Sequence, residues 1–179
     1  MKQYMGCLVW WAAAMSPAHA QADAPSAPAL RTEFVFGARI KVDKPLVIGQ
    51  SAHGLRRVVP IVGGTVSGPA LTGTVVPGGA DWQFVRPDGV VDVQAKYTLK
   101  ADDGTLVMVD NRGVRHAPPA VLERMAKGEH VPANAYYFRT TARFEAPLGS
   151  KYEWLNRAVF IGVAERHPDA ALIRFYRVD

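Results

Sequence analysis

The chain has 179 residues, with 21 lysines and arginines against 16 aspartates and glutamates, and its formal net charge is +5. The basic residues are scattered instead of being clustered with aromatic residues on one face, which argues against a nucleic-acid-binding protein and leaves room for an anionic small ligand. The only cysteine, Cys7, precedes the predicted domain, so that domain can have neither a disulfide nor a thiol nucleophile.

The N-terminal segment has the pattern of an export signal. Lys2 supplies a positive charge, residues 5–15 form an apolar run too short to span a bilayer, and Ala18-His19-Ala20 matches a small-x-small cleavage site. We therefore predict a signal peptide over residues 1–20, with cleavage after Ala20 and a periplasmic or secreted product. A buried N-terminal helix is the alternative.

The rest of the chain is predicted to be a flexible linker followed by one domain. Residues 21–30 are rich in alanine, proline, serine and aspartate, a composition typical of linkers. Residues 31–179 are enough for a single domain with a hydrophobic core. None of their apolar stretches is long enough for a transmembrane helix.

Apolar and polar residues alternate after residue 31, which is the pattern of half-buried strands. Glycine-rich and Asp-Gly turn signals divide this region into short runs. In chain order, strands are predicted over residues 33–42, 55–65, 71–76, 82–86, 90–99 and 105–109.

One helix is predicted to interrupt the strands. Pro118-Pro119 can begin it, an apolar stripe runs from Val121 to Met125, and Gly128 ends it. Strands resume over residues 136–144, 158–163 and 172–178. These elements predict an all-β fold, a single antiparallel up-and-down β-barrel of about eight or nine strands with one short helix. A two-sheet sandwich is the alternative.

The segment over residues 77–89 carries aspartate, tryptophan, glutamine and arginine between two turn signals, and it is therefore the first place to look for a site. If Asp88-Gly89 is a two-residue hairpin loop, Arg86 lies opposite Val91, and each face of the hairpin has one character. The apolar face carries Trp82, Phe84 and Tyr97, and the polar face carries Asp81, Gln83 and Asp92. The pattern leaves open which face points into the barrel, and a bulge at Gly78-Gly79 could turn Asp81 inward.

The strand over residues 136–145 has the same division, with Tyr137, Arg139 and Glu145 on one face. Arg139 and Glu145 are separated by roughly 20 Å along an extended strand, so they cannot pair directly. Each needs a partner on another strand, and a ligand can be that partner.

The sequence lacks the motifs of several common kinds of catalytic site. No serine lies in a nucleophile elbow, the histidines lack metal-ligand spacing, and the glycine pairs do not precede helices as phosphate-binding loops do. We therefore predict neither a metal nor a cofactor. What remains are carboxylates, tyrosines and arginines, which can transfer protons unaided because burial raises the pKa of a carboxyl group and an arginine can hold an anion.

A set of motifs in the domain resembles one family. In chain order they are Gly63-Gly64-Thr65, Gly68-Pro69, Pro77-Gly78-Gly79-Ala80-Asp81-Trp82, Arg86-Pro87-Asp88-Gly89, Tyr97-Thr98-Leu99, Asp102-Asp103-Gly104, Tyr136-Tyr137-Phe138-Arg139, Phe144-Glu145 and Tyr152-Glu153-Trp154-Leu155-Asn156. Over residues 32–178 the chain resembles domain of unknown function 3237, also called uncharacterised protein family 0311. The resemblance implies a small antiparallel β-barrel and implies no particular reaction.

We first hypothesise a cofactor-free isomerase, lyase or hydratase that acts on a small carbonyl or carboxylate compound by proton transfer. The predicted catalytic residues are Asp81, Tyr97, Arg139 and Glu145. The predicted substrate-binding residues are Trp82, Arg86, Asp92, Tyr137, Trp154 and Asn156. The alternative is a non-catalytic periplasmic barrel that binds an anionic or carbonyl-containing small molecule. A third hypothesis is an interaction protein that uses its outer surface, and homo-oligomers are compatible with all three.

Overall fold

Alternation of buried and exposed side chains makes most of the chain β-strand, as the period-two pattern predicts. The computed structural model describes residues 29–179, so the predicted signal peptide (1–20) and nearly all of the predicted linker (21–30) lie outside the described residues. The strands are β1 (Thr32–Val42), β2 (Leu46–Ser51), β3 (Gly54–Ser67), β4 (Gly73–Val85), β5 (Val91–Ala101), β6 (Leu106–His116), β7 (Tyr137–Glu145), β8 (Val159–Arg166) and β9 (Ala170–Val178). The helices are α1 (Pro119–Ala126) and two short 3-10 helices, η1 (Ala133–Ala135) and η2 (Glu153–Arg157).

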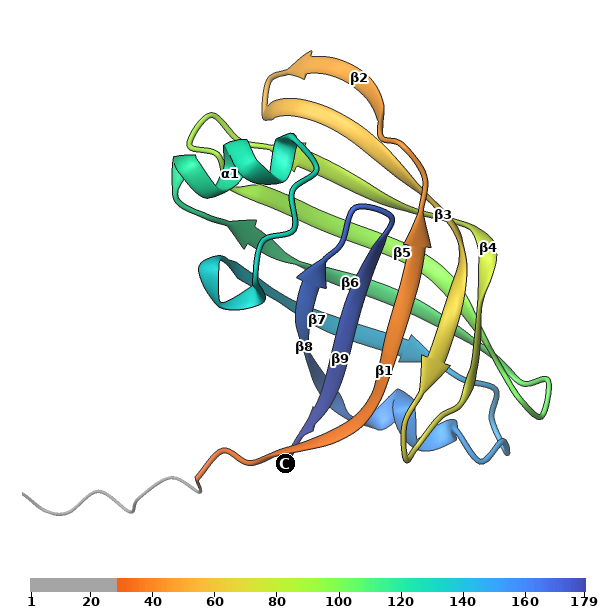
Figure 1. Cartoon of the computed structure of the whole chain (residues 1–179). Helices are drawn as coiled ribbons and strands as arrows, with labels where there is room; N and C mark the ends of the chain where they lie inside the picture. Colours follow the sequence, from red (N-terminus) through yellow and green to blue (C-terminus); the bar gives the residue numbers. More distant parts are fainter. Residues whose placement is uncertain (1–28) are drawn as a thin grey trace, which may run out of the picture.

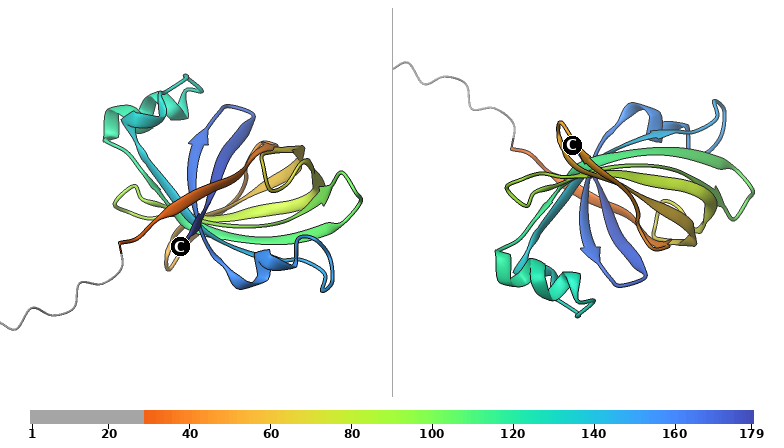
Figure 2. Two further views of the ribbon diagram at one scale, coloured as in Figure 1. Left: turned by 90° about the horizontal axis from the view of Figure 1, so that it is seen from below. Right: turned by 90° about the horizontal axis from the view of Figure 1, so that it is seen from above.

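Eight strands close into a barrel. They follow the order β1-β9-β8-β7-β6-β5-β4-β3, every neighbouring pair is antiparallel, and β1 also pairs with β3 (Figures 1 and 2). β2 pairs with β3 outside this closed ring. The predicted up-and-down barrel with one short helix is therefore confirmed. Within residues 29–179, no helix combines the length and hydropathy needed to cross a membrane.

Two details of the predicted strands are wrong. The predicted strands over residues 71–76 and 82–86 are parts of one strand, β4, because Pro77-Gly78-Gly79 lies in a bulged segment of that strand instead of forming a turn. The bulge falls where the register with β5 shifts, between Val76 and Ala80. Strand β2 is absent from the prediction, and its apolar residues Leu46, Val47 and Ile48 are exposed.

The hairpin between β4 and β5 differs from its predicted register by one residue. The amide of Arg86 donates to the carbonyl of Val90 at 2.8 Å, so the loop has three residues and ends at Gly89, whose φ is +82°. Val85 therefore lies opposite Val91, and the predicted pairing of Arg86 with Val91 is wrong. A shift of one residue reverses the face of every paired side chain. As a result, Asp81 faces the barrel interior beside Ala95.

The two ends of the barrel are filled differently. At the end that carries η2, four phenylalanines from β1, β7, β8 and β9 pack against one another with ring centroids 4.9–5.5 Å apart. They are Phe36, Phe144, Phe160 and Phe175. At the end that carries α1, the inner face bears several polar and charged side chains, and they line a cavity. The first end is a solid core, and the second holds the candidate site.

We expect Phe144→Ala to lower the free energy of unfolding by about 3–5 kcal/mol, because it removes a ring that contacts three of the other rings in the core. Urea unfolding of the purified protein measures this change. Val159→Ala, at a position that is 64% exposed on β8, is the control and should change the free energy by less than about 0.5 kcal/mol. Equal effects of the two substitutions would show that the aromatic cluster is not the main core.

Candidate functional site

A cavity of about 300 Å³ lies inside the barrel at the end that carries α1. This volume is at the lower end of the range for small-molecule sites. The ends of β1, β4, β6 and β8 and the beginnings of β3, β5, β7 and β9 all contribute to its wall. Its apolar wall includes Val59, Val85, Val91, Leu122, Met125 and Phe138. The cavity is therefore partly open to solvent, and its wall combines apolar side chains with a group of charged and polar ones.

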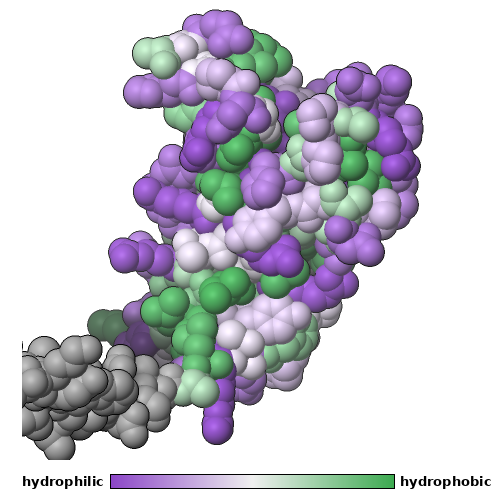
Figure 3. Space-filling view, turned by 90° about the vertical axis from the view of Figure 1, so that its left-hand side faces the viewer, coloured by the Kyte–Doolittle hydropathy of each residue, from purple (hydrophilic) through white to green (hydrophobic). Residues whose placement is uncertain are grey.

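Helix α1 covers one side of the cavity mouth. Its apolar stripe points inward, so that Leu122 and Met125 line the cavity and Met125 is buried. The helix begins at Pro119 and is followed by Gly128, whose φ of +79° suits a residue without a side chain. Hydrophilic side chains cover much of the molecular face that carries α1 (Figure 3). The helix is thus amphipathic and shields one side of the cavity from solvent.

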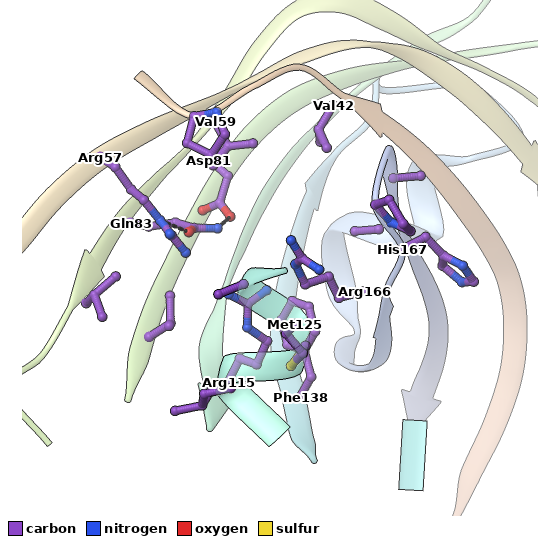
Figure 4. Close-up of a pocket in the computed structure, with 18 of the residues that line it drawn as sticks. Val42, Arg57, Val59, Asp81, Gln83, Arg115, Met125, Phe138, Arg166 and His167 are labelled. Atoms are coloured by element: carbon purple, nitrogen blue, oxygen red, sulfur yellow. Dashed lines mark hydrogen bonds between the residues drawn. The ribbon is translucent and has the colours of Figure 1, made fainter. Parts of the chain in front are cut away.

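Asp81 lies in the cavity wall, and each oxygen of its carboxyl group accepts a hydrogen bond. Its Oδ1 accepts a hydrogen bond from the backbone amide of Gln94 at 2.8 Å, and its Oδ2 accepts one from the side-chain amide of Gln83. Gln83 in turn accepts a hydrogen bond from Nε of Arg57 at 2.7 Å. Arg57, Gln83 and Asp81 therefore form a chain of hydrogen bonds along the wall (Figure 4).

Burial raises the pKa of the Asp81 carboxyl group above its ordinary value. The hydrogen bonds from Gln83 and Gln94 and the positive charges of Arg115 and Arg57 act in the opposite direction, and they cancel only part of the effect. A carboxyl group of this kind holds its proton to a higher pH than a surface aspartate does. It can therefore serve as a general acid as well as a base.

Three arginines line the same cavity as Asp81: Arg57, Arg115 and Arg166. Arg115 is 9% exposed, and burial, followed by the charges of Arg166 and Arg57, lowers its pKa to about 10. Among residues 29–179, no acidic side chain forms an ion pair with any of the three. Arg115 and Arg166 reach into the space opposite Asp81 (Figure 4).

Tyr97 adds a buried hydroxyl group near Asp81. It lies on β5 two residues from Ala95, which is opposite Asp81, and its side chain is 2% exposed. Burial raises the pKa of Tyr97, and the charge of Asp81 raises it further, so the phenol keeps its proton. The Tyr97 hydroxyl has no hydrogen-bond partner in the described part of the chain, and neither has Nε of Arg115. Of the two, Arg115 lines the cavity, whereas Tyr97 lies in the barrel interior outside the cavity lining.

Two of the four predicted catalytic residues, Asp81 and Tyr97, face the barrel interior together. Arg139 and Glu145 do not join them, because both lie on the outer face of β7. There the Arg139 guanidinium donates to the carbonyl of Phe138 at 2.9 Å and lies over the ring of Tyr137, itself a predicted binding residue. These three residues stay candidates only for a site on the outer surface.

The other predicted binding residues also lie away from the cavity. Trp82 is on the face of β4 opposite to Asp81, and Arg86 forms an exposed ion pair with Asp92 at the hairpin. Trp154 packs against Phe160 at the solid end of the barrel. Asn156 is structural at that end, because its side chain makes two hydrogen bonds with the backbone of Ala146, at 2.8 and 2.9 Å.

Three arginines in the cavity wall are not among the residues predicted from the sequence, namely Arg57, Arg115 and Arg166. The position of Arg115 in the sequence indicates that it faces inward, because it follows the buried residues Val107 and Val109 in strict period two along β6. Arg57 likewise precedes Val59 in period two on β3. Among residues 29–179, no group of three His, Asp or Glu side chains is placed to hold a metal ion.

The fold and the cavity define a class of protein: a small antiparallel β-barrel with an arginine-lined internal cavity around one raised-pKa carboxyl group. Residues 30–178 match the family described as "Protein of unknown function (DUF3237)". The chain belongs to this family, as the resemblance of its motifs predicts.

Known relatives agree with this placement. A UPF0311 protein from Clostridium acetobutylicum is 43% identical over 147 residues, which cover 82% of this chain and 92% of that protein. The crystal structure of a conserved protein of unknown function from Rhodopseudomonas palustris is 38% identical, with a TM-score of 0.80 over 86% of this chain and all of that one.

A more distant relative is described as an enzyme. The protein named "Hydroalkoxylation enzyme phnH" from Penicillium herquei is 23% identical over 155 residues, 87% of each chain. A crystal structure of an enzyme from Penicillium herquei is 20% identical, with a TM-score of 0.65 over 87% of this chain and all of that one. This likeness shows the barrel fold.

We expect the stability difference between Asp81→Asn and the wild type to depend on pH. Because the pKa of Asp81 is raised on folding, the carboxyl group favours the folded state below the pKa of an unfolded aspartate, about 3.9, and this contribution is lost as the pH rises through the folded-state pKa. The variant should therefore gain stability relative to the wild type as the pH increases over this window. Urea unfolding at a series of pH values measures the difference, and a constant difference would contradict the raised pKa.

Proposed function

We propose that this protein is an enzyme that transfers protons within the barrel cavity, an isomerase, lyase or hydratase acting on a small carbonyl or carboxylate compound. The observation that carries the proposal is Asp81, a carboxyl group with a raised pKa, held by two hydrogen bonds at the wall of a cavity of about 300 Å³. Such a group can donate a proton to substrate and take it back at a pH where a surface aspartate cannot.

The arrangement suits addition to a carbon–carbon double bond that is conjugated with a carbonyl group. As the oxygen of the nucleophile bonds to the β-carbon, negative charge develops on the carbonyl oxygen, where Arg115 in the cavity wall can stabilise it. Asp81 delivers its proton to the α-carbon and recovers one from the oxygen of the nucleophile. The reverse sequence is an elimination, and a proton moved between two carbons of the substrate is an isomerisation.

Gln83 and Arg57 have a positioning role in this scheme. The hydrogen bond from Gln83 fixes one oxygen of Asp81, and Arg57 fixes the amide of Gln83. The carboxyl group thus keeps one orientation toward the cavity without any rearrangement during the reaction, which is the condition for effective acid–base catalysis.

The distant relative supports the reaction class. A hydroalkoxylation adds the O–H group of an alcohol across a carbon–carbon double bond, and a hydration does the same with water. The name of the Penicillium herquei protein therefore agrees with an addition reaction in a barrel of this fold. The site residues of this chain support the proposal independently, since an acid and anion-stabilising groups surround one cavity.

A non-catalytic binding barrel is the second candidate. The observation that favours it is the pair of arginines, Arg115 and Arg166, whose side chains would hold an anionic ligand equally well without any reaction. We also propose that the protein acts in the periplasm or outside the cell, on the basis of the predicted signal over residues 1–20. N-terminal sequencing of the protein from a periplasmic fraction should begin at Gln21.

Untargeted mass spectrometry of a metabolite extract incubated with residues 21–179 tests the enzyme proposal. We expect one mass to disappear while a related mass appears. Asp81→Asn should slow this conversion by about 10²–10⁴-fold, the usual contribution of a general acid or base. The matched control is Asp110→Asn, which removes a carboxyl group that pairs with Arg112 on the outer surface, and it should convert at the wild-type rate.

Two outcomes of this experiment would contradict the proposal. A compound that is retained unchanged by the wild type would identify a binding protein. Conversion by Asp81→Asn at the rate of the control would show that another group transfers the proton. A folded variant is established beforehand by its thermal unfolding profile.

A further inference from the structure

The cavity holds more positive charge than its acidic groups balance. Arg57 is committed to Gln83 through a hydrogen bond of 2.7 Å. In the part of the chain that the structure describes, the guanidinium groups of Arg115 and Arg166 make no side-chain hydrogen bond or ion pair with another residue, and Nε of Arg115 is fully buried. Arg115 lies over the ring of Phe138, 5.6 Å from its centroid, but a buried guanidinium without an anionic partner is still costly in free energy.

The other charged or titratable groups around this space do not neutralise the two arginines. Asp81 faces them from β4, and Tyr97, two residues after the Ala95 that pairs with Asp81, is buried in β5 outside the cavity lining. At the mouth, Asp43 accepts a hydrogen bond from the amide of Lys44. His167, on the turn after β8, has its Nε2 3.8 Å from Glu165, whose carboxylate is already paired with Arg174. The excess charge is therefore positive and is concentrated at Arg115 and Arg166.

We infer that Arg115 and Arg166 form a binding site for the carboxylate of a small organic acid, and that binding of this anion is coupled to uptake of a proton by Asp81. The inference rests on the proposed function in that it assigns the substrate class of the same cavity. Figure 4 shows the geometry that supports it, with both guanidinium groups across the open space from the Asp81 carboxyl group. The wall formed by Val59, Val91, Leu122 and Met125 would contact the apolar body of the acid.

The coupling follows from the charges that act on Asp81. In the free protein, the positive charges of Arg115 and Arg57 favour the ionised carboxylate and oppose the effect of burial. A carboxylate bound to Arg115 and Arg166 would cancel much of that positive charge and add a negative charge facing Asp81. Both changes favour the protonated form. Binding of the substrate would therefore favour the protonated form of Asp81, the form that can act as a general acid. By linkage, the affinity of the protein for the anion would fall as the pH rises.

Calorimetric titration with benzoate, against benzamide as the neutral molecule of the same shape, tests the inference without requiring turnover. We expect benzoate to bind more tightly than benzamide by about 10- to 100-fold, the effect of a charge-assisted hydrogen bond. Titrations in two buffers with different ionisation enthalpies measure the protons exchanged. Net uptake should be largest between the pKa values of Asp81 in the free and bound protein.

Three substitutions separate the two parts of the inference. Arg166→Gln and Arg115→Gln should each weaken benzoate binding by about 10- to 100-fold while leaving benzamide binding unchanged. Asp81→Asn should retain benzoate binding and abolish proton uptake. Arg112→Gln, which removes an exposed guanidinium paired with Asp110, is the control and should change neither quantity. Arg166 is partly exposed, so its variant provides the test if Arg115→Gln does not fold.

The following results would contradict the inference or separate it from the proposed function. Equal affinity for benzoate and benzamide, or no loss of benzoate binding in the arginine variants, would exclude the carboxylate site. Proton uptake that persists in Asp81→Asn would assign the coupling to another group such as His167. Binding and proton uptake without any turnover of extract components would uphold this inference and refute the proposed enzyme, so that the two failures can be told apart.

Discussion

The structure of the site depends on one constraint: a carboxyl group has been placed inside a barrel where water cannot fully solvate its charge. Burial raises the pKa of Asp81, while the hydrogen bonds from Gln83 and Gln94 and two nearby arginines stabilise its ionised form. Burial outweighs the opposing influences, so the pKa of Asp81 stays above its ordinary value. Every feature of the cavity that we connect with function acts on this pKa.

One end of the barrel contributes most of the apolar packing, and the other end holds the polar cavity. At one end, four phenylalanine rings fill the interior and supply the apolar burial that holds the strands together. At the other end, the same eight strands present arginine, aspartate and glutamine to a cavity under α1. Unsatisfied polar groups are destabilising, and the solid aromatic end offsets this cost. This division allows the cavity residues to vary in chemistry while the aromatic end preserves the fold.

Much of the fold follows from alternation alone. Period two along most of the strands, one amphipathic stripe before Gly128 and the absence of long apolar runs were sufficient to predict the barrel and its helix. The site was harder, because a strand that lines a polar cavity breaks the rule that apolar residues face inward. The sequence predicts Asp81 and Tyr97 as site residues and shows Arg115 only as one of the scattered basic residues, although its period-two position on β6 places it inside.

The face of β4 could not be predicted because it depends on the length of a loop. Asp88-Gly89 is typical of a two-residue hairpin, and only the hydrogen bond between Arg86 and Val90 shows that Pro87 also belongs to the loop. Arg139 and Glu145 were selected because their side chains have no partner within their own strand. That observation holds equally for residues on the outer surface, where the structure places them.

The three-residue loop at Pro87–Gly89 has a consequence for how this barrel can evolve. Neighbouring residues on a strand point to opposite sides. Whether the loop has an odd or an even number of residues therefore influences which alternate residues of β4 face the interior. The loss of a single residue there, if the pairing of β4 with β3 shifted with it, would exchange Asp81 for Trp82 in the interior and convert a polar pocket into an aromatic one. Substitutions in the loop are mild by comparison. Insertions and deletions at this hairpin are therefore a direct route by which relatives with the same fold could acquire cavities of unrelated chemistry.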